Sequence, residues 1–95
     1  MSDPTDSAVV HDPEGRRWTV AGEAGEARLD YSLSDGVLTI RHTEVPQAMS
    51  GRGIAGRLVA AAVEFARGHG YRVRPACEYA EVWMARHPEH DDLRA

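Results

Sequence analysis

Residues 46–58 read Pro46-Gln-Ala-Met-Ser-Gly-Arg-Gly-Ile-Ala-Gly-Arg-Leu58 and join two segments of different hydrophobic period. Before them, apolar and polar side chains alternate over residues 37–45, which is typical of a strand. After them, apolar residues recur with a helical period from Ile54 to Phe65. This stretch therefore predicts a strand, a glycine-rich turn and an amphipathic helix, in that order.

Three glycines occupy the turn and the start of the helix: Gly51, Gly53 and Gly56. The first backbone N–H groups of a helix lack partners within the helix, and the helix dipole adds partial positive charge there. Glycine lets a ligand approach this backbone without meeting a Cβ. The turn therefore predicts a binding site for a phosphorylated cofactor.

Strand signals also precede residue 37. Residues 17–20 favour a strand, and apolar residues alternate with polar ones over residues 27–33. Turns are expected at Gly22–Gly25 and at Asp35-Gly36, since these residues tolerate positive φ. Three consecutive antiparallel strands result.

Helix and strand signals alternate after residue 58. Gly68-His69-Gly70 ends the first helix, residues 71–75 favour a strand, and residues 77–86 favour a second helix that stops before Pro88. The predicted order is β-β-β-α-β-α, an antiparallel meander followed by one βαβ crossover. We expect an α/β sandwich with a mixed sheet as a single domain over residues 8–95, preceded by a disordered tail at residues 1–7.

Composition excludes several classes of protein. The 95 residues suffice for one domain, and a net charge of −4 with a pI near 5.7 argues against nucleic acid as the main partner. No apolar run is long enough to cross a membrane, and the N-terminus lacks the basic region of a signal peptide. The single cysteine, Cys77, cannot form an internal disulfide. A cytoplasmic protein is therefore expected.

The spacing of the three glycines also fits the dinucleotide pattern Gly-x-Gly-x-x-Gly. That site needs its first glycine directly after a central parallel strand and needs two mononucleotide-binding halves. Here residues 46–50 separate the strand from Gly51, the earlier strands form a meander, and the chain is too short for two halves. We therefore do not expect NAD to be the cofactor.

Four short motifs surround or contain the turn: His42-Thr43-Glu44-Val45-Pro46, Gly51-Arg52-Gly53-Ile54-Ala55, Pro75-x-Cys77-x-Tyr79 and Arg86-His87-Pro88-Glu89. Together they resemble the minimal, single-domain branch of the GNAT acetyltransferase superfamily, over about residues 17–92. Gly53 and Ala55 match the last two fixed positions of its pyrophosphate signature. Ser50 stands where the superfamily has Gln or Arg, which removes one phosphate contact from a site built mainly of backbone.

The resemblance implies that acetyl-coenzyme A lies between the strand of residues 37–45 and the strand that begins near Tyr71. The pantetheine arm would pair with the backbone near Val45, and the side chain of Arg52 would reach a phosphate or stay in solvent. The pyrophosphate would bind the amides of Gly51, Arg52, Gly53, Ile54, Ala55 and Gly56.

Candidate catalytic residues follow at the end of the same strand. By strict alternation, His42 and Glu44 share a face with Leu38 and Ile40. An amine with a free pKa near 10 must lose a proton before it attacks a carbonyl, so a base is required. The resemblance implies an acid on this strand that acts through water, with Glu44 as first candidate and His42 as second. The alternative is a salt bridge or an exposed pair at the strand end.

Cys77 and Tyr79 are further candidates at the start of the second helix. The helix dipole favours a thiolate at Cys77, and the resemblance implies that this residue lies near the sulfur of the cofactor. Cys77 is then an acyl-accepting nucleophile, a residue that lines the site, or a small buried residue. Tyr79 either returns a proton to the departing thiolate or belongs to the core.

The predicted function is that of an acetyl-CoA-dependent N-acetyltransferase whose acceptor amine, on a small molecule or on a protein or peptide lysine, attacks the thioester directly. The alternative is a noncatalytic module that binds CoA or acyl-CoA. No metal is expected, because the spacing of His87, His90, Asp91 and Asp92 matches no compact structural zinc site. A monomer is expected, or a weak homodimer formed through an exposed sheet edge.

Overall fold

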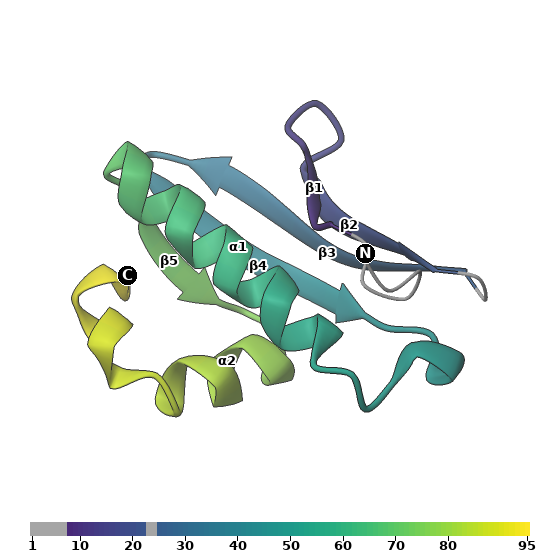
Figure 1. Ribbon diagram of the computed structural model, residues 1–95. Coiled ribbons are helices and arrows are strands. Elements are labelled where there is room, and N and C mark those ends of the chain that lie inside the picture. The colour runs from purple at the N-terminus through teal and green to yellow at the C-terminus, as the bar shows by residue number, and fades with distance from the viewer. Residues whose placement is uncertain (1–7, 23–24) are drawn as a thin grey trace.

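The computed structural model describes residues 8–22 and 25–95, which form a five-stranded sheet with two helices on one face (Figure 1). The tail predicted at residues 1–7 lies outside the described residues, as does the centre of the turn at residues 23–24. The strands lie side by side in sequence order: β1 (Val10–Asp12), β2 (Arg17–Gly22), β3 (Gly25–Ser34), β4 (Val37–Glu44) and β5 (Arg72–Pro75).

Neighbouring strands from β1 to β4 are antiparallel, and β5 is parallel to β4. The predicted meander with one βαβ crossover is therefore confirmed. The short strand β1 was not predicted, because three residues are too few to show a period.

The crossover helix is α1 (Ile54–His69), and the second helix is α2 (Glu78–Ala85). Helix α1 ends where Gly70 takes a left-handed φ of 71°, as the glycine signal predicted. Two short 3₁₀ helices were not predicted, at Gln47–Met49 and Pro88–Leu93. None of the described helices is long and apolar enough to span a bilayer.

One buried apolar cluster joins the sheet to both helices. Helix α1 crosses the sheet (Figure 1). Helix α2 lies beside the N-terminal half of α1, near β5. The largest fully buried side chains come from β2, β3, β4, β5, α1 and α2: Val20, Leu29, Leu38, Ile40, Val73, Leu58, Val59, Val63 and Met84. Because both helices pack on the same face, the opposite face of the sheet is polar, and none of its described side chains is buried. We call it the open face.

A bulge in β4 changes the direction of the side chains near its end. Tyr31 of β3 pairs with Ile40, whereas the preceding residue Asp30 pairs with His42. Arg41 is therefore an extra residue on β4, and the alternation of its side chains shifts by one position at this point.

This shift overturns one prediction from the sequence. Thr43, the partner of the buried Leu29, now lies on the helix side of the sheet. His42 and Glu44 lie on the open face, so the prediction that they share a face with Ile40 is wrong. The period-two rule failed because it assumes a ladder without bulges.

Candidate functional site

Strands β4 and β5 diverge part-way along β4. Their pairing ends at Ile40 and Pro75, after which the amide of Ala76 donates to the carbonyl of Ile40 at 2.9 Å. Strand β4 continues as far as Glu44, and no strand among the described residues pairs with it on that side. The region between the two strand ends, which we call the gap, therefore leaves main-chain groups of β4 available to a ligand.

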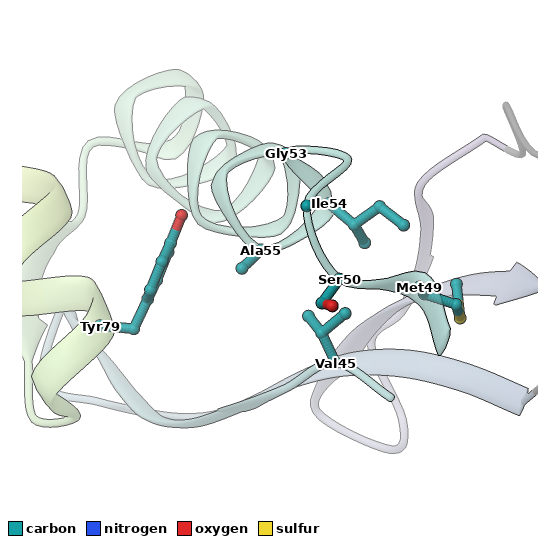
Figure 2. Close-up of a pocket in the computed structure, with 8 residues that line it drawn as sticks. Val45, Met49, Ser50, Gly53, Ile54, Ala55 and Tyr79 are labelled. Carbon is teal, nitrogen blue, oxygen red and sulfur yellow. The ribbon is translucent and has the colours of Figure 1, made fainter. Parts of the chain in front are cut away.

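A cavity of about 210 Å³ lies beside the gap, on the helix side of the sheet (Figure 2). It is lined by the end of β4, the glycine-rich turn, the first residues of α1 and one residue of α2. The lining residues are Val45, Met49, Ser50, Gly51, Gly53, Ile54, Ala55 and Tyr79. All of these except Met49 and Ser50 were predicted site residues, and the two exceptions lie in the turn itself.

The N-terminus of α1 is bare where it meets this cavity. Its N-cap residue is Gly53, no side chain caps it, and its first turn holds no acidic residue. The first helical hydrogen bond runs from the amide of Arg57 to the carbonyl of Gly53 at 3.1 Å. The amides of Ile54, Ala55 and Gly56 are therefore without helical partners, and they are suited to an anion.

The three glycines of the turn serve different purposes. Gly51 and Gly53 have left-handed φ values of 79° and 71°, and a Cβ on either would meet no atom within 4 Å. A Cβ on Gly56 would instead lie 3.4 Å from Tyr79 Oη and 3.5 Å from Trp83 Nε1. Gly51 and Gly53 thus shape the turn, whereas Gly56 allows α1 to pack closely on α2, a role not foreseen from the sequence.

Cys77, at the start of α2, contacts the end of β4 through its side chain. It is half-buried, and as the N-cap residue of α2 its Sγ accepts a hydrogen bond from the amide of Ala80 at 3.4 Å. The same sulfur lies 3.5 Å from Thr43 Oγ1. Thr43 was not predicted as a site residue, because only the bulge in β4 turns it toward Cys77.

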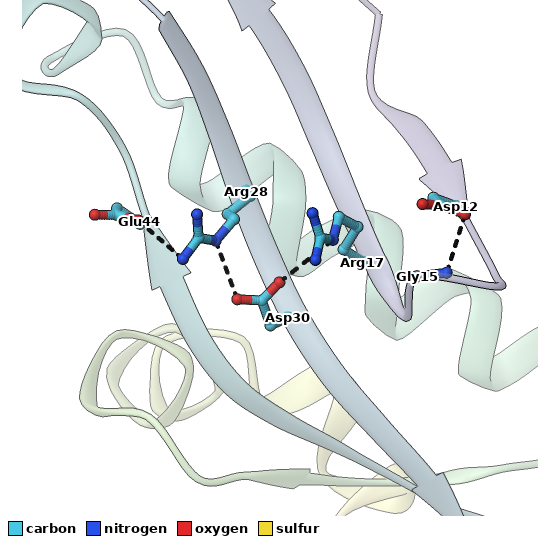
Figure 3. Close-up of polar contacts among 6 residues, drawn as sticks. All are labelled: Asp12, Gly15, Arg17, Arg28, Asp30 and Glu44. Carbon is cyan, nitrogen blue, oxygen red and sulfur yellow. Dashed lines mark hydrogen bonds and ion pairs between the residues drawn. The ribbon is translucent and has the colours of Figure 1, made fainter.

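Glu44 belongs to a row of ion pairs across β2, β3 and β4 on the open face (Figure 3). Arg28 Nη2 lies 3.3 Å from Glu44 Oε1, and Arg28 Nε lies 3.1 Å from Asp30 Oδ2. Arg17 Nε lies 3.7 Å from Asp30 Oδ1 and ends the row. We call these four residues the charge ladder; the salt bridge that the sequence left open as an alternative for Glu44 is therefore present.

Residues 17–93 match the sequence model of the GCN5-related N-acetyltransferase family. This chain belongs to that family. Protein NATD1 from Bos taurus is 35% identical over 83 residues, which cover 84% of this chain and 74% of the relative. Protein NATD1 from Homo sapiens is 34% identical over the same length, with the same coverage.

A solved structure supports the fold of this GCN5-related N-acetyltransferase family member. The solution structure of a GCN5-like protein from Staphylococcus aureus superposes with a TM-score of 0.74, covering 93% of this chain and 87% of that one. Its sequence identity is 21%, so it supports the fold alone. The resemblance stated from the sequence is confirmed, and the family's general chemistry is acetyl transfer.

In this member of the GCN5-related N-acetyltransferase family, the predicted site residues fall into two groups on opposite sides of the sheet. The cavity-lining residues, including Tyr79, lie on the helix side with Cys77 nearby. His42 and Glu44 lie on the open face, where both side chains are exposed. The gap between β4 and β5 is the place where the two groups approach each other.

Proposed function

We propose that the protein is an acetyl-CoA-dependent N-acetyltransferase in which the acceptor amine attacks the thioester directly. The observation that carries this proposal is the bare N-terminus of α1, which meets the cavity beside the gap. An unpaired set of amides with positive partial charge suits the pyrophosphate of coenzyme A. Family membership supplies the acetyl chemistry.

The residues present fit this cofactor without a change of backbone. Gly51 and Gly53 leave the turn open, and the amides of residues 54–56 offer three donors to phosphate oxygens. Hydrogen bonds to charged acceptors contribute about 1.5–3 kcal/mol each, so three contribute roughly 5–9 kcal/mol before ordering costs. Micromolar affinity corresponds to about 8 kcal/mol. Arg52 is exposed and able to add a further phosphate contact.

The pantetheine arm is proposed to run along the free side of β4 toward the gap, beginning at Val45. In that position it would pair with main-chain groups that β5 does not use. The thioester would then lie near Thr43 and Cys77, where β4 meets the start of α2.

The chemical step requires a base on the acceptor side and an acid near the sulfur. The amine nitrogen forms a bond to the acetyl carbonyl carbon, the C–S bond breaks, and the amine proton passes through water to Glu44. Tyr79 or solvent protonates the departing thiolate. Cys77 lines the site in this mechanism without forming a bond, and His42 is the second candidate for the base.

The two sides of the sheet then have separate tasks in this proposal. The cofactor occupies the helix side, and the acceptor approaches the gap from the open face, on which Glu44 lies. A cytoplasmic location, which the single cysteine favours, belongs to the same proposal.

The decisive test is an amide NMR titration of the labelled protein with acetyl-CoA, CoA and NADH in parallel. We expect saturable shifts at Val45 and at residues 51–56 with both CoA species and none with NADH. Mass spectrometry of an amine panel incubated with acetyl-CoA then tests transfer. The absence of shifts with CoA would contradict the proposal. Binding of CoA without transfer to any amine would instead indicate a noncatalytic CoA-binding module.

A further inference from the structure

The open face offers an uncovered strand surface to an extended partner. It is formed by alternate side chains of β2 to β5, and no element among residues 8–22 and 25–95 covers it. Figure 3 shows it with the helices behind the strands. Small-molecule sites are concave and bury most of their ligand. No described side chain on the open face is buried, so this face suits an extended peptide segment better than a small molecule.

The charges on this face are paired near its centre and unpaired beside the gap. In the charge ladder, the carboxylates of Asp30 and Glu44 pair with the two arginines. Arg41 and Arg74 are both exposed, and neither side chain makes an ion pair or hydrogen bond within the described parts of the chain. A protein with a net charge of −4 thus carries unpaired positive charge at this place.

The register of β5 on β4 places these two arginines at the same edge of the gap. Arg74 pairs with Thr39, which alternates with the buried Leu38 and Ile40 and so lies on the open face. Arg41 comes two residues farther along β4; because it is exposed and directly follows the buried Ile40, alternation places it on the same face. Spacings of about 4.8 Å between strands and 3.3 Å along them place the two Cα atoms roughly 8 Å apart.

We propose that the acceptor is a lysine in a peptide segment with acidic neighbours, and that Arg41 and Arg74 bind those acidic side chains on the open face. This inference rests on the proposed function and names its substrate class. The lysine enters the gap toward Glu44, while carboxylates on either side of it meet the two guanidinium groups. Arginine suits this task because its planar donors match a carboxylate in a bidentate contact.

Binding of matched peptides tests the docking step without any cofactor. Two pentapeptides blocked at both ends, Gly-Glu-Lys-Glu-Gly and Gly-Gln-Lys-Gln-Gly, differ only in two charges. In amide NMR titrations we expect the acidic peptide to bind about three- to tenfold more tightly, with shifts at Arg41 and Arg74 that weaken as salt is added. Equal binding of the two peptides would overturn the inference, as would equally tight binding of free glutamate.

Variants test whether the two arginines cause the preference for the acidic peptide. The double variant R41Q/R74Q is expected to bind both peptides equally and to keep the wild-type affinity for CoA. The control R86Q removes one positive charge from the end of α2, off the open face, and is expected to retain the preference. A preference that persists in R41Q/R74Q would contradict the proposed role of the arginines.

The acetylation assay separates this inference from the proposed function. At saturating acetyl-CoA, KM for the acidic peptide should be about three- to tenfold below that of the amide peptide, with similar kcat. Transfer to both peptides with equal KM would overturn only the substrate class. Absence of CoA binding, with the acidic peptide still bound at Arg41 and Arg74, would overturn only the acetyltransferase proposal.

Discussion

Arg28 Nη2 lies 3.3 Å from Glu44 Oε1 on the open face, at the end of β4 beside the gap. Both side chains are about half exposed, at 42% and 55%, so the pair contributes little to stability. Arg28 also contacts Asp30, and the charge ladder thereby restricts where the Glu44 carboxylate can point. The ion pair therefore orients the side chain that we propose as the general base.

Replacing Glu44 with Gln should lower turnover by about 100-fold, because a general base typically contributes 10² or more to the rate. Affinity for CoA should not change, since Glu44 lies on the face opposite the cavity. Steady-state kinetics and a CoA titration measure the two effects. Glu26→Gln is the control, because Glu26 is an exposed carboxylate of β3. Unchanged turnover in Glu44→Gln would remove this residue from the mechanism.

Replacing Gly53 with Ala should weaken CoA binding and destabilise the fold. Its φ of 71° disfavours a side chain by about 1 kcal/mol, and the turn that presents the amides of α1 must shift to relieve that strain. Gly36→Ala is a matched control, since Gly36 has a φ of 75° and equally open surroundings in the turn between β3 and β4.

Chemical denaturation and CoA titrations of the two glycine variants separate these effects. Both variants should lose about 1 kcal/mol of unfolding free energy, and only Gly53→Ala should lose affinity for CoA. If the two variants bind CoA equally well, the turn at Gly53 does not hold the cofactor.

The features that the sequence predicted correctly depend on local signals. The period change at residue 54 and the glycine at residue 70 predicted both ends of α1. Cys77 was predicted at the start of α2, where it is the N-cap residue. The glycine-rich turn was also placed correctly beside the end of β4. In each case, neighbouring residues alone determine the backbone conformation.

The features that the sequence missed depend on pairing between distant residues. The bulge at Arg41 is set by the register of β4 against β3, and no local pattern in residues 37–44 reveals it. It turns Glu44 to the open face and Thr43 toward Cys77. The short strand β1 is likewise held by partners elsewhere in the chain, including Trp18 on β2.

Replacing Cys77 with Ala should leave turnover within about twofold of the wild type, because direct attack by the amine needs no acyl-enzyme. The variant loses the sulfur that caps α2 and should lose roughly 0.5–1 kcal/mol of stability. Cys77→Ser keeps a capping group and serves as the control for stability. An acetyl adduct on wild-type Cys77 in intact-mass spectra, together with an inactive Cys77→Ala, would instead support a covalent mechanism.

His11 holds β1 against the rest of the molecule. Its ring stacks on Trp18 at a centroid distance of 4.1 Å, and its Nε2 lies 2.8 Å from Tyr31 Oη. Burial lowers the pKa of His11 below its ordinary value of 6.5, and the nearby His69 lowers it further, whereas the Asp12 carboxylate acts in the opposite direction. The folded protein therefore favours the neutral imidazole.

This lowered pKa predicts a loss of stability in mild acid. The unfolded chain takes up a proton at His11 near pH 6.5, whereas the folded protein takes it up only at lower pH. The free energy of unfolding should therefore fall as the pH drops below 6.5 and level off below the folded pKa. His11→Phe should reduce this dependence in denaturation curves measured from pH 7.5 to about 4.5, and the control His42→Gln, at an exposed site, should retain it. Identical pH dependence in wild type and His11→Phe would show that His11 is not the group that titrates.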